Sequence, residues 1–75
     1  MPRESFYHYL MTRRNFKSSH PIAQFAKNAF YDESFPKQSR NFNLISKYLE
    51  ENGNYLPTMV IFDQAWRDYL NHVHP

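Results

Sequence analysis

The residues best suited to chemistry in this chain are a short run of basic side chains around an aromatic ring. Arg13, Arg14 and Lys17 flank Phe16. Guanidinium and ammonium groups bind phosphate oxygens, and an aromatic ring offers a face on which a nucleobase can stack. The run therefore predicts a nucleic-acid-binding site at the end of a first helix, formed by Arg13, Arg14, Phe16 and Lys17.

The same four residues also have a purely structural interpretation. Cationic side chains at the C-terminus of a helix stabilise its dipole and satisfy its last carbonyl groups. In that case the ring of Phe16 folds back onto the core instead of facing a ligand. The two interpretations differ in whether this ring points into the protein or out of it, and the sequence leaves both open.

Other kinds of site find little support. His72 and His74 are two positions apart, which on a helix places them on different faces, and the chain has no cysteine. Ser5 and His8 are three positions apart, but Ser5 suits a helix cap and no third residue would orient the histidine. No glycine-rich phosphate-binding loop is present. We therefore expect no catalytic residue, no metal, no cofactor and no small-molecule substrate, and a protein that is not an enzyme.

The distribution of charge along the chain is a better indication of a macromolecular partner than the net charge is. The net charge is +2, but residues 1–40 hold seven basic and three acidic side chains, while residues 41–75 hold two and four. Such asymmetry can steer a partner or favour head-to-tail self-association. The first residues carry no apolar signal region, and the longest apolar run, residues 59–62, is far shorter than a membrane span. We expect a cytoplasmic protein with no membrane partner.

Aromatic residues predict the architecture that must position these side chains. Fourteen of the 75 residues are aromatic, and most recur at helical spacing on four segments. Rings bury large areas, which a domain this small needs. A single glycine leaves few hairpin turns. The pattern predicts one all-α domain over residues 1–75, a compact bundle of four helices, or five if the bend at 35–37 includes a short helical turn.

Boundary residues and apolar stripes define the expected helices. The expected N-caps are Ser5 for the first helix, Ser19 or His20 for the second, and Ser39 for the third. Pro21 and Pro57 are expected to open the second and fourth helices. Gly53 is expected to end the third helix in a left-handed conformation. The first helix is expected to fray near residues 14–15. The expected buried stripes are Phe6, Tyr9 and Leu10; Ile22, Phe25, Ala26, Ala29 and Phe30; Phe42, Ile45 and Leu49, widened by Leu44 and Tyr48; and Met59, Phe62, Trp66, Tyr69, Leu70 and Val73. Phe35 is expected to plug the core, which leaves Phe16, Tyr7, Tyr31 and Tyr55 as the rings that could contact a partner.

In order and with matching gaps, many of these residues resemble the signature of the YozE family, short proteins of low-GC Gram-positive bacteria. The matching segments are Ser5-Phe6-Tyr7, Leu10-Met11, Arg14, Phe35-Pro36-Lys37, Phe42-Asn43, Ile45-Ser46, Tyr48, Met59, Phe62-Asp63 and Tyr69. The resemblance implies a four-helix bundle similar to the sterile alpha motif, in a cytoplasmic bacterial protein. It carries over no catalytic or binding residue. The sequence departs from the expected signature at Asn41, where the family implies an acidic residue.

Two functions follow as hypotheses. The first is weak, salt-sensitive contact with nucleic acid, DNA above all, through the basic run, which Arg3, Lys37 and Arg40 would extend if they share its face. The alternative is a protein–protein interaction module, in which the positive first half of one copy meets the negative second half of another copy or of a different protein.

Overall fold

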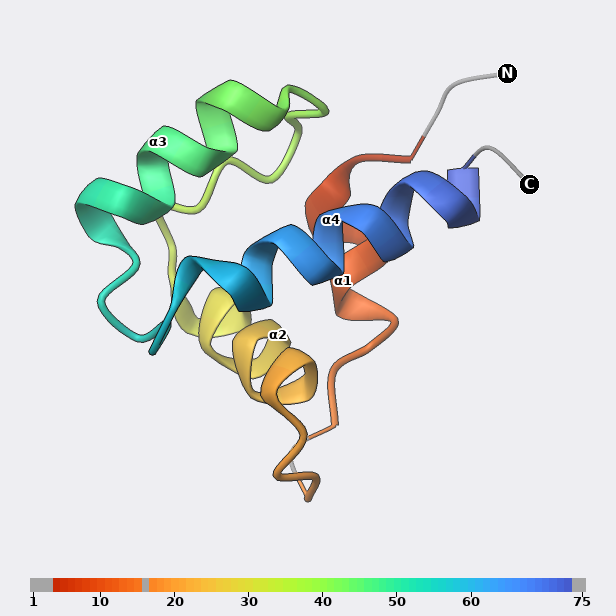
Figure 1. The fold of residues 1–75 in the computed structure, drawn as a ribbon, viewed down its shortest axis with the longest axis vertical. Coiled ribbons are helices and arrows are strands. Elements are labelled where there is room, and N and C mark those ends of the chain that lie inside the picture. Colours follow the sequence, from red (N-terminus) through yellow and green to blue (C-terminus); the bar gives the residue numbers. More distant parts are fainter. Residues whose placement is uncertain (1–3, 16, 74–75) are drawn as a thin grey trace.

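The computed structural model describes residues 4–15 and 17–73, and Phe16 lies outside them. The described residues form the helices α1 (Phe6–Met11), α2 (Pro21–Tyr31), α3 (Phe42–Asn52) and α4 (Met59–Val73), with no strand among them (Figure 1). The expected all-α fold is confirmed. Residues 32–41, where a fifth helical turn was an alternative, form turns and bends.

Helix α4 is the central element of the bundle. It packs against α1, α2 and α3, and α1 also packs against α2, whereas α4 is the only helix that α3 packs against. In Figure 1, α3 (green) accordingly lies apart from α1 and α2. The hydroxyl group of Tyr69 donates a hydrogen bond to the main-chain oxygen of Glu4 at 2.7 Å. This bond fixes the segment before α1 to the last turns of α4.

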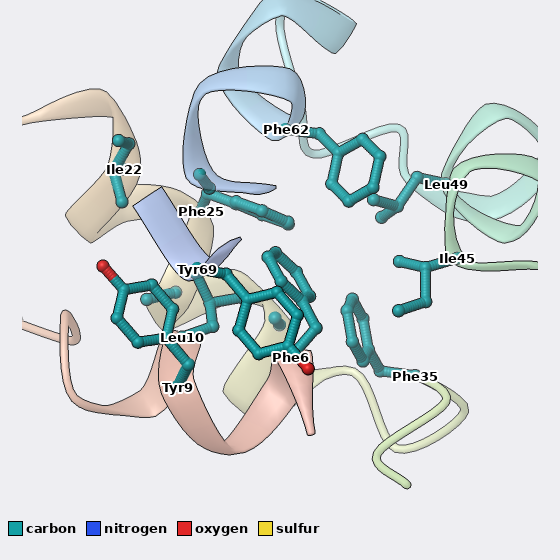
Figure 2. Close-up of a cluster of buried hydrophobic side chains, with 13 residues drawn as sticks. Phe6, Tyr9, Leu10, Ile22, Phe25, Phe35, Ile45, Leu49, Phe62 and Tyr69 are labelled. Atoms are coloured by element: carbon teal, nitrogen blue, oxygen red, sulfur yellow. The ribbon is translucent and has the colours of Figure 1, made fainter. Parts of the chain in front are cut away.

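The core is built from aromatic rings around Phe6, which is completely buried. Five other rings have centroids within 6.5 Å of the Phe6 ring, namely Phe25, Phe35, Phe62, Trp66 and Tyr69. Figure 2 shows Phe6, Phe25, Phe62 and Tyr69 converging from different helices, with Phe35 reaching in from the segment after α2. Phe35 is 3 % exposed, so its expected role as a plug is confirmed. Pairs of rings in edge and offset arrangements add attraction beyond the area that they bury.

Four residues of the expected stripes are more exposed than the periodicity predicts. Phe30, Phe42, Leu44 and Leu70 are each more than a third exposed. Phe30 lies in the last turn of α2. Helix α1 ends at Met11, three residues before the expected end. Phe42 is the first residue of α3, and its ring contacts those of Phe62 and Trp66, each with centroids 5.3 Å apart. Burial at these positions depends on contacts with other elements, which helical periodicity does not encode.

Side-chain caps begin the first three helices. The Ser5 hydroxyl accepts a hydrogen bond from the His8 N–H, which confirms this cap, and the His20 imidazole accepts from the Ile22 N–H at 3.2 Å. The expected Ser39 cap of α3 is wrong. Asn41 is the N-cap, and its Oδ1 accepts from the N–H of Leu44 at 3.1 Å. Ser39 instead accepts from the Asn41 N–H, in the turn that leads into the helix.

Gly53 ends α3 for a different reason from the one expected. Its φ is −95°, outside the left-handed region, so the prediction of a left-handed residue was wrong. A Cβ atom at this position would lie 2.6 Å from the carbonyl oxygen of Leu49 and 2.9 Å from its Cδ2. This position therefore requires a residue without a side chain, and it does not require an unusual backbone conformation.

Helix α4 begins at Met59, two residues after Pro57, and Thr58 Oγ1 accepts from the Val60 N–H at 3.3 Å.

Candidate nucleic-acid interface

The structure divides the predicted basic run between two sides of α1. Arg13 turns towards α4, where its Nη1 donates to the Tyr9 hydroxyl oxygen at 3.2 Å and lies 3.6 Å from Asp68 Oδ2. Both charged partners are partly exposed, so this pair stabilises the fold by at most about 1 kcal/mol. The carboxylate of Asp68 nevertheless offsets the positive charge of Arg13. Arg13 is therefore poorly placed to be the main phosphate contact.

Arg14 turns the other way, towards α2. The guanidinium carbon lies 4.3 Å from the centroid of the Phe30 ring, and Nη1 lies 3.6 Å from the sulfur of Met11. The backbone explains why these neighbours diverge. The N–H groups of Arg13 and Arg14 bond to the carbonyl oxygens of Leu10 and Met11, so a last turn continues past α1. Consecutive residues of such a turn project in different directions.

Of the other two predicted residues, Lys17 is exposed, and its N–H donates to Asn15 Oδ1 at 3.0 Å. Phe16 lies outside the described residues, so the orientation of its ring stays a prediction. Among the described residues, a ring that lies beside the Arg14 guanidinium is Phe30, which the apolar periodicity of the second helix predicts to be buried. A basic side chain and an accessible ring thus occur together, but through a tertiary contact between α1 and α2.

A second pair of a cation and a ring lies on the same side of α1 as Arg14. Lys37 Nζ is 5.5 Å from the centroid of the Tyr7 ring, and that ring lies 5.5 Å from the ring of Phe35. Tyr7 and Met11 are four positions apart on α1 and so share one face. This face joins the two pairs, because Met11 also contacts Arg14.

Two residues of α2 extend this region. The ring of Tyr31 meets that of Phe30 edge-on, with centroids 5.1 Å apart, and it is 65 % exposed. Lys27 lies three and four positions before these rings, so it shares their side of the helix. We call this region the basic–aromatic surface; it consists of Tyr7, Met11, Arg14, Lys27, Phe30, Tyr31 and Lys37. It combines three cations with three rings.

The basic–aromatic surface borders a shallow hollow at Tyr31. The hollow has a volume of about 350 Å³ and is lined by Asn28, Tyr31, Asp32, Asn52, Asn54 and Tyr55. The side chains of Asn28 and Asn54 form no hydrogen bond with any described residue, and Asn52 donates to the Tyr48 carbonyl oxygen at 3.3 Å. Apart from Asp32, the lining is uncharged. Its amide groups can both donate and accept hydrogen bonds.

Asp32 organises the wall of this hollow. Its carboxylate accepts hydrogen bonds from the Tyr48 hydroxyl at 2.8 and 2.7 Å and from the Tyr55 hydroxyl at 2.9 Å. Burial, the hydrogen bond to Asp32 and the negative charge of Asp32 raise the pKa of Tyr48 to about 12. The same causes, with a smaller contribution from Tyr48, raise the pKa of Tyr55. Tyr55, expected to be a rim residue or an anchor for a partner, is thus tied into the fold.

Sequence reasoning missed this cluster because its members are 16 and 23 positions apart. No local spacing signals such a contact.

A smaller polar cluster joins the ends of the chain that the structure describes. Glu4 Oε1 lies 2.5 Å from Nε2 of His72, and Glu4 Oε2 lies 3.8 Å from Nδ1 of His8. Within residues 4–15 and 17–73, no group of three or more His, Cys, Asp or Glu side chains is arranged to hold a metal ion. None of the helices in the described part of the chain is long and apolar enough to cross a membrane.

Comparison with known proteins places this architecture in a family. A family model described as the YozE SAM-like fold matches residues 5–71. A UPF0346 protein of Ligilactobacillus salivarius is 63 % identical over 67 residues, which is 89 % of each chain. Another, from Limosilactobacillus reuteri, is 56 % identical over 69 residues, covering 92 % of this chain and 94 % of its own.

The solution NMR structure of the UPF0346 protein yozE from Bacillus subtilis is similar to this one in fold and in sequence. It superposes with a TM-score of 0.85 at 49 % identity, covering 95 % of this chain and 87 % of that chain. The names of these relatives describe no activity, substrate or partner. The expected resemblance and the sterile-alpha-motif-like helical fold are both confirmed. By its match over residues 5–71 and its similarity to bacterial relatives along nearly their whole length, this chain belongs to the YozE SAM-like fold family.

Proposed function

We propose that this protein is a small non-enzymatic module that binds nucleic acid, DNA above all, through the basic–aromatic surface. The observation that carries the proposal is the position of the Arg14 guanidinium over the Phe30 ring, beside the exposed ring of Tyr31. A guanidinium held against a ring loses less conformational freedom when it binds a phosphate, and the neighbouring ring offers a face to a base. Lys27 and Lys37 supply two further cations on the same surface.

The small number of cations limits the affinity for nucleic acid. Each phosphate contact releases bound counterions, so affinity falls with salt by a slope of roughly −0.7 to −0.9 per contact. For three contacts, a rise from about 50 to 200 mM salt lowers the affinity roughly 20- to 40-fold. The nearby acidic groups of Asp32 and Glu33 oppose binding of a second stretch of backbone. The expected mode is therefore weak and tolerant of sequence.

Fluorescence anisotropy with a labelled DNA 20-mer, single-stranded and as a duplex, tests the proposal at both salt concentrations. Arg14→Glu is expected to lower the affinity at least about tenfold at low salt, since it removes one phosphate contact and adds a repulsive charge. Arg67→Glu is the matched control, because it makes the same charge change at an exposed position on α4, outside the basic–aromatic surface. Absence of binding at low salt, or equal effects of the two substitutions, would overturn the proposal.

A second candidate is head-to-tail association through opposite charges. The basic–aromatic surface lies on α1, on α2 and just after α2, whereas Glu50, Glu51 and Asp63 are exposed on α3 and α4. Light scattering over a range of protein concentrations at low and high salt tests it. Self-association that salt weakens, and that Lys37→Glu and Glu51→Lys each reduce and together restore, would support this candidate over nucleic-acid binding. A monomer under all conditions would exclude it.

A further inference from the structure

We infer that the hollow beside Tyr31 receives an unpaired nucleobase, so that the ligand of the basic–aromatic surface is single-stranded nucleic acid. The juxtaposition that carries the inference is the ring of Tyr31, with cations on one side and, on the other, a hollow lined by amide groups and the Asp32 carboxylate. The inference rests on the proposed function and specifies its ligand.

Tyr31 belongs to both features. Its ring packs edge-on against Phe30, which carries the Arg14 guanidinium, and it also lines the hollow together with Asn28. Tyr31 is 65 % exposed, and stacking on a tyrosine ring is possible for any base, because every base has a π-face. A base stacked there therefore has its phosphate near the cations and its edge towards the hollow.

The lining of the hollow suits the edge of a base better than it suits a phosphate. Asn28 and Asn54 have amide groups that form no hydrogen bond with the described residues, and asparagine is a residue type that reads base edges in pairs of hydrogen bonds. The negative charge of the Asp32 carboxylate in the same wall repels phosphate. The backbone of the strand is thereby confined to the cationic side of Tyr31.

Base pairing would prevent this arrangement. In a duplex the bases are stacked on one another and paired, so a ring on the protein surface cannot stack on them without unstacking. Single strands are consequently the better ligands, despite the higher charge density of a duplex.

The test compares three labelled ligands of equal length: oligo-dT, the same backbone without bases, and a duplex. We expect oligo-dT to bind roughly 5- to 150-fold more tightly than the abasic strand, the range that stacking of one base gives. Oligo-dT is also expected to bind more tightly than the duplex. Tyr31→Ala is expected to lower the affinity for oligo-dT by a similar factor and to leave the abasic strand unaffected. Tyr31→Phe, which keeps the ring, restores the affinity for oligo-dT.

Two further variants localise the base. Asn28→Ala is expected to lower the affinity for oligo-dT a few-fold and to leave binding of the abasic strand unchanged, whereas Asn43→Ala, an exposed asparagine on α3 outside the hollow, is the control. Circular dichroism establishes that each variant is folded.

The outcomes separate this inference from the proposed function. Equal binding of oligo-dT and the abasic strand, or tighter binding of the duplex, overturns the inference and leaves binding through the cations intact. The same holds if Tyr31→Ala weakens both strands equally, because the ring then acts on the backbone. If none of the three ligands binds, the proposed function itself fails and the inference fails with it.

Discussion

The hydroxyl group of Tyr55 donates a hydrogen bond to Oδ2 of Asp32 at 2.9 Å and thereby ties the link between α3 and α4 to the end of α2. Tyr48, from α3, donates to the same carboxylate. Helix α3 packs against no helix other than α4, so these two bonds are additional ties to the rest of the bundle. Asp32 and Tyr55 also line the hollow beside Tyr31. The geometry of the candidate site therefore depends on a contact that stabilises the fold.

Removing the Tyr55 hydroxyl is expected to destabilise the protein. A hydrogen bond to a charged group contributes about 1.5–3 kcal/mol, and we expect a loss of that order in the free energy of unfolding of Tyr55→Phe. Tyr7→Phe is the control, because the Tyr7 hydroxyl forms no hydrogen bond with the described residues, and its effect is expected to stay within about 0.5 kcal/mol. Urea unfolding measures both. Equal stabilities of the two variants would show that the Asp32 contact contributes little.

Stability is also expected to fall at high pH because of the same cluster. The pKa of Tyr48 is about 12 in the folded protein and 10.0 as the reference value, and the pKa of Tyr55 is raised too. Between these values the folded state binds more protons than the unfolded state, so the free energy of unfolding decreases as pH rises. The contribution is complete below about pH 10 and disappears as pH passes about 12.

Urea unfolding between pH 8 and 12 tests this dependence, with Tyr48→Phe as the variant and Tyr7→Phe as the control. Lysines titrate in the same range. Their contribution is common to all three proteins, so it cancels when the proteins are compared. Tyr48→Phe is expected to lose less stability across this range than the other two. Parallel curves for all three proteins would contradict the raised pKa of Tyr48.

Gly53→Ala is expected to destabilise the protein even though the backbone there has an ordinary negative φ. At an unhindered site this substitution would stabilise by about 0.4–1 kcal/mol, because alanine restricts the unfolded chain. Here the new Cβ would meet the Leu49 carbonyl oxygen at 2.6 Å. Relief of that clash is expected to cost about 1–3 kcal/mol. Thermal unfolding measures the sign, and a raised midpoint would show that the end of α3 can shift to make room.

Arg13 and Arg14 are expected to differ in nucleic-acid binding despite being adjacent. Arg14→Gln should lower the affinity for single-stranded DNA several-fold at low salt and reduce the salt slope by about 1, as the loss of one phosphate contact does. Arg13→Gln should change the affinity less than about twofold, because Asp68 already offsets its charge. Anisotropy titrations of the two variants at several salt concentrations provide the comparison. Equal losses would show that the side chain of Arg13 leaves Asp68 to bind the ligand.

The candidate site could be predicted only in part. A basic run next to an aromatic ring is visible in the sequence, and Arg14 does lie beside a ring. That ring is Phe30, however, which joins Arg14 through packing of the segment after α1 against α2. Phe30 is 41 % exposed although it belongs to the apolar stripe of α2, and Tyr31 lines a hollow together with residues of the link between α3 and α4. None of these relationships lies within one helical turn.

The sequence by itself determined the helical class, the family, the first capping residue and most of the ring core, including the plug formed by Phe35. These features depend on interactions between residues within about four positions, or on apolar periodicity, which a sequence displays directly. Only the tertiary structure decided that Arg13 faces Asp68 while Arg14 faces Phe30, and that Asp32 receives two tyrosine hydroxyls. Those choices depend on where each helix ends and which element it meets, because side chains far apart in the chain form contacts only after the helices have packed.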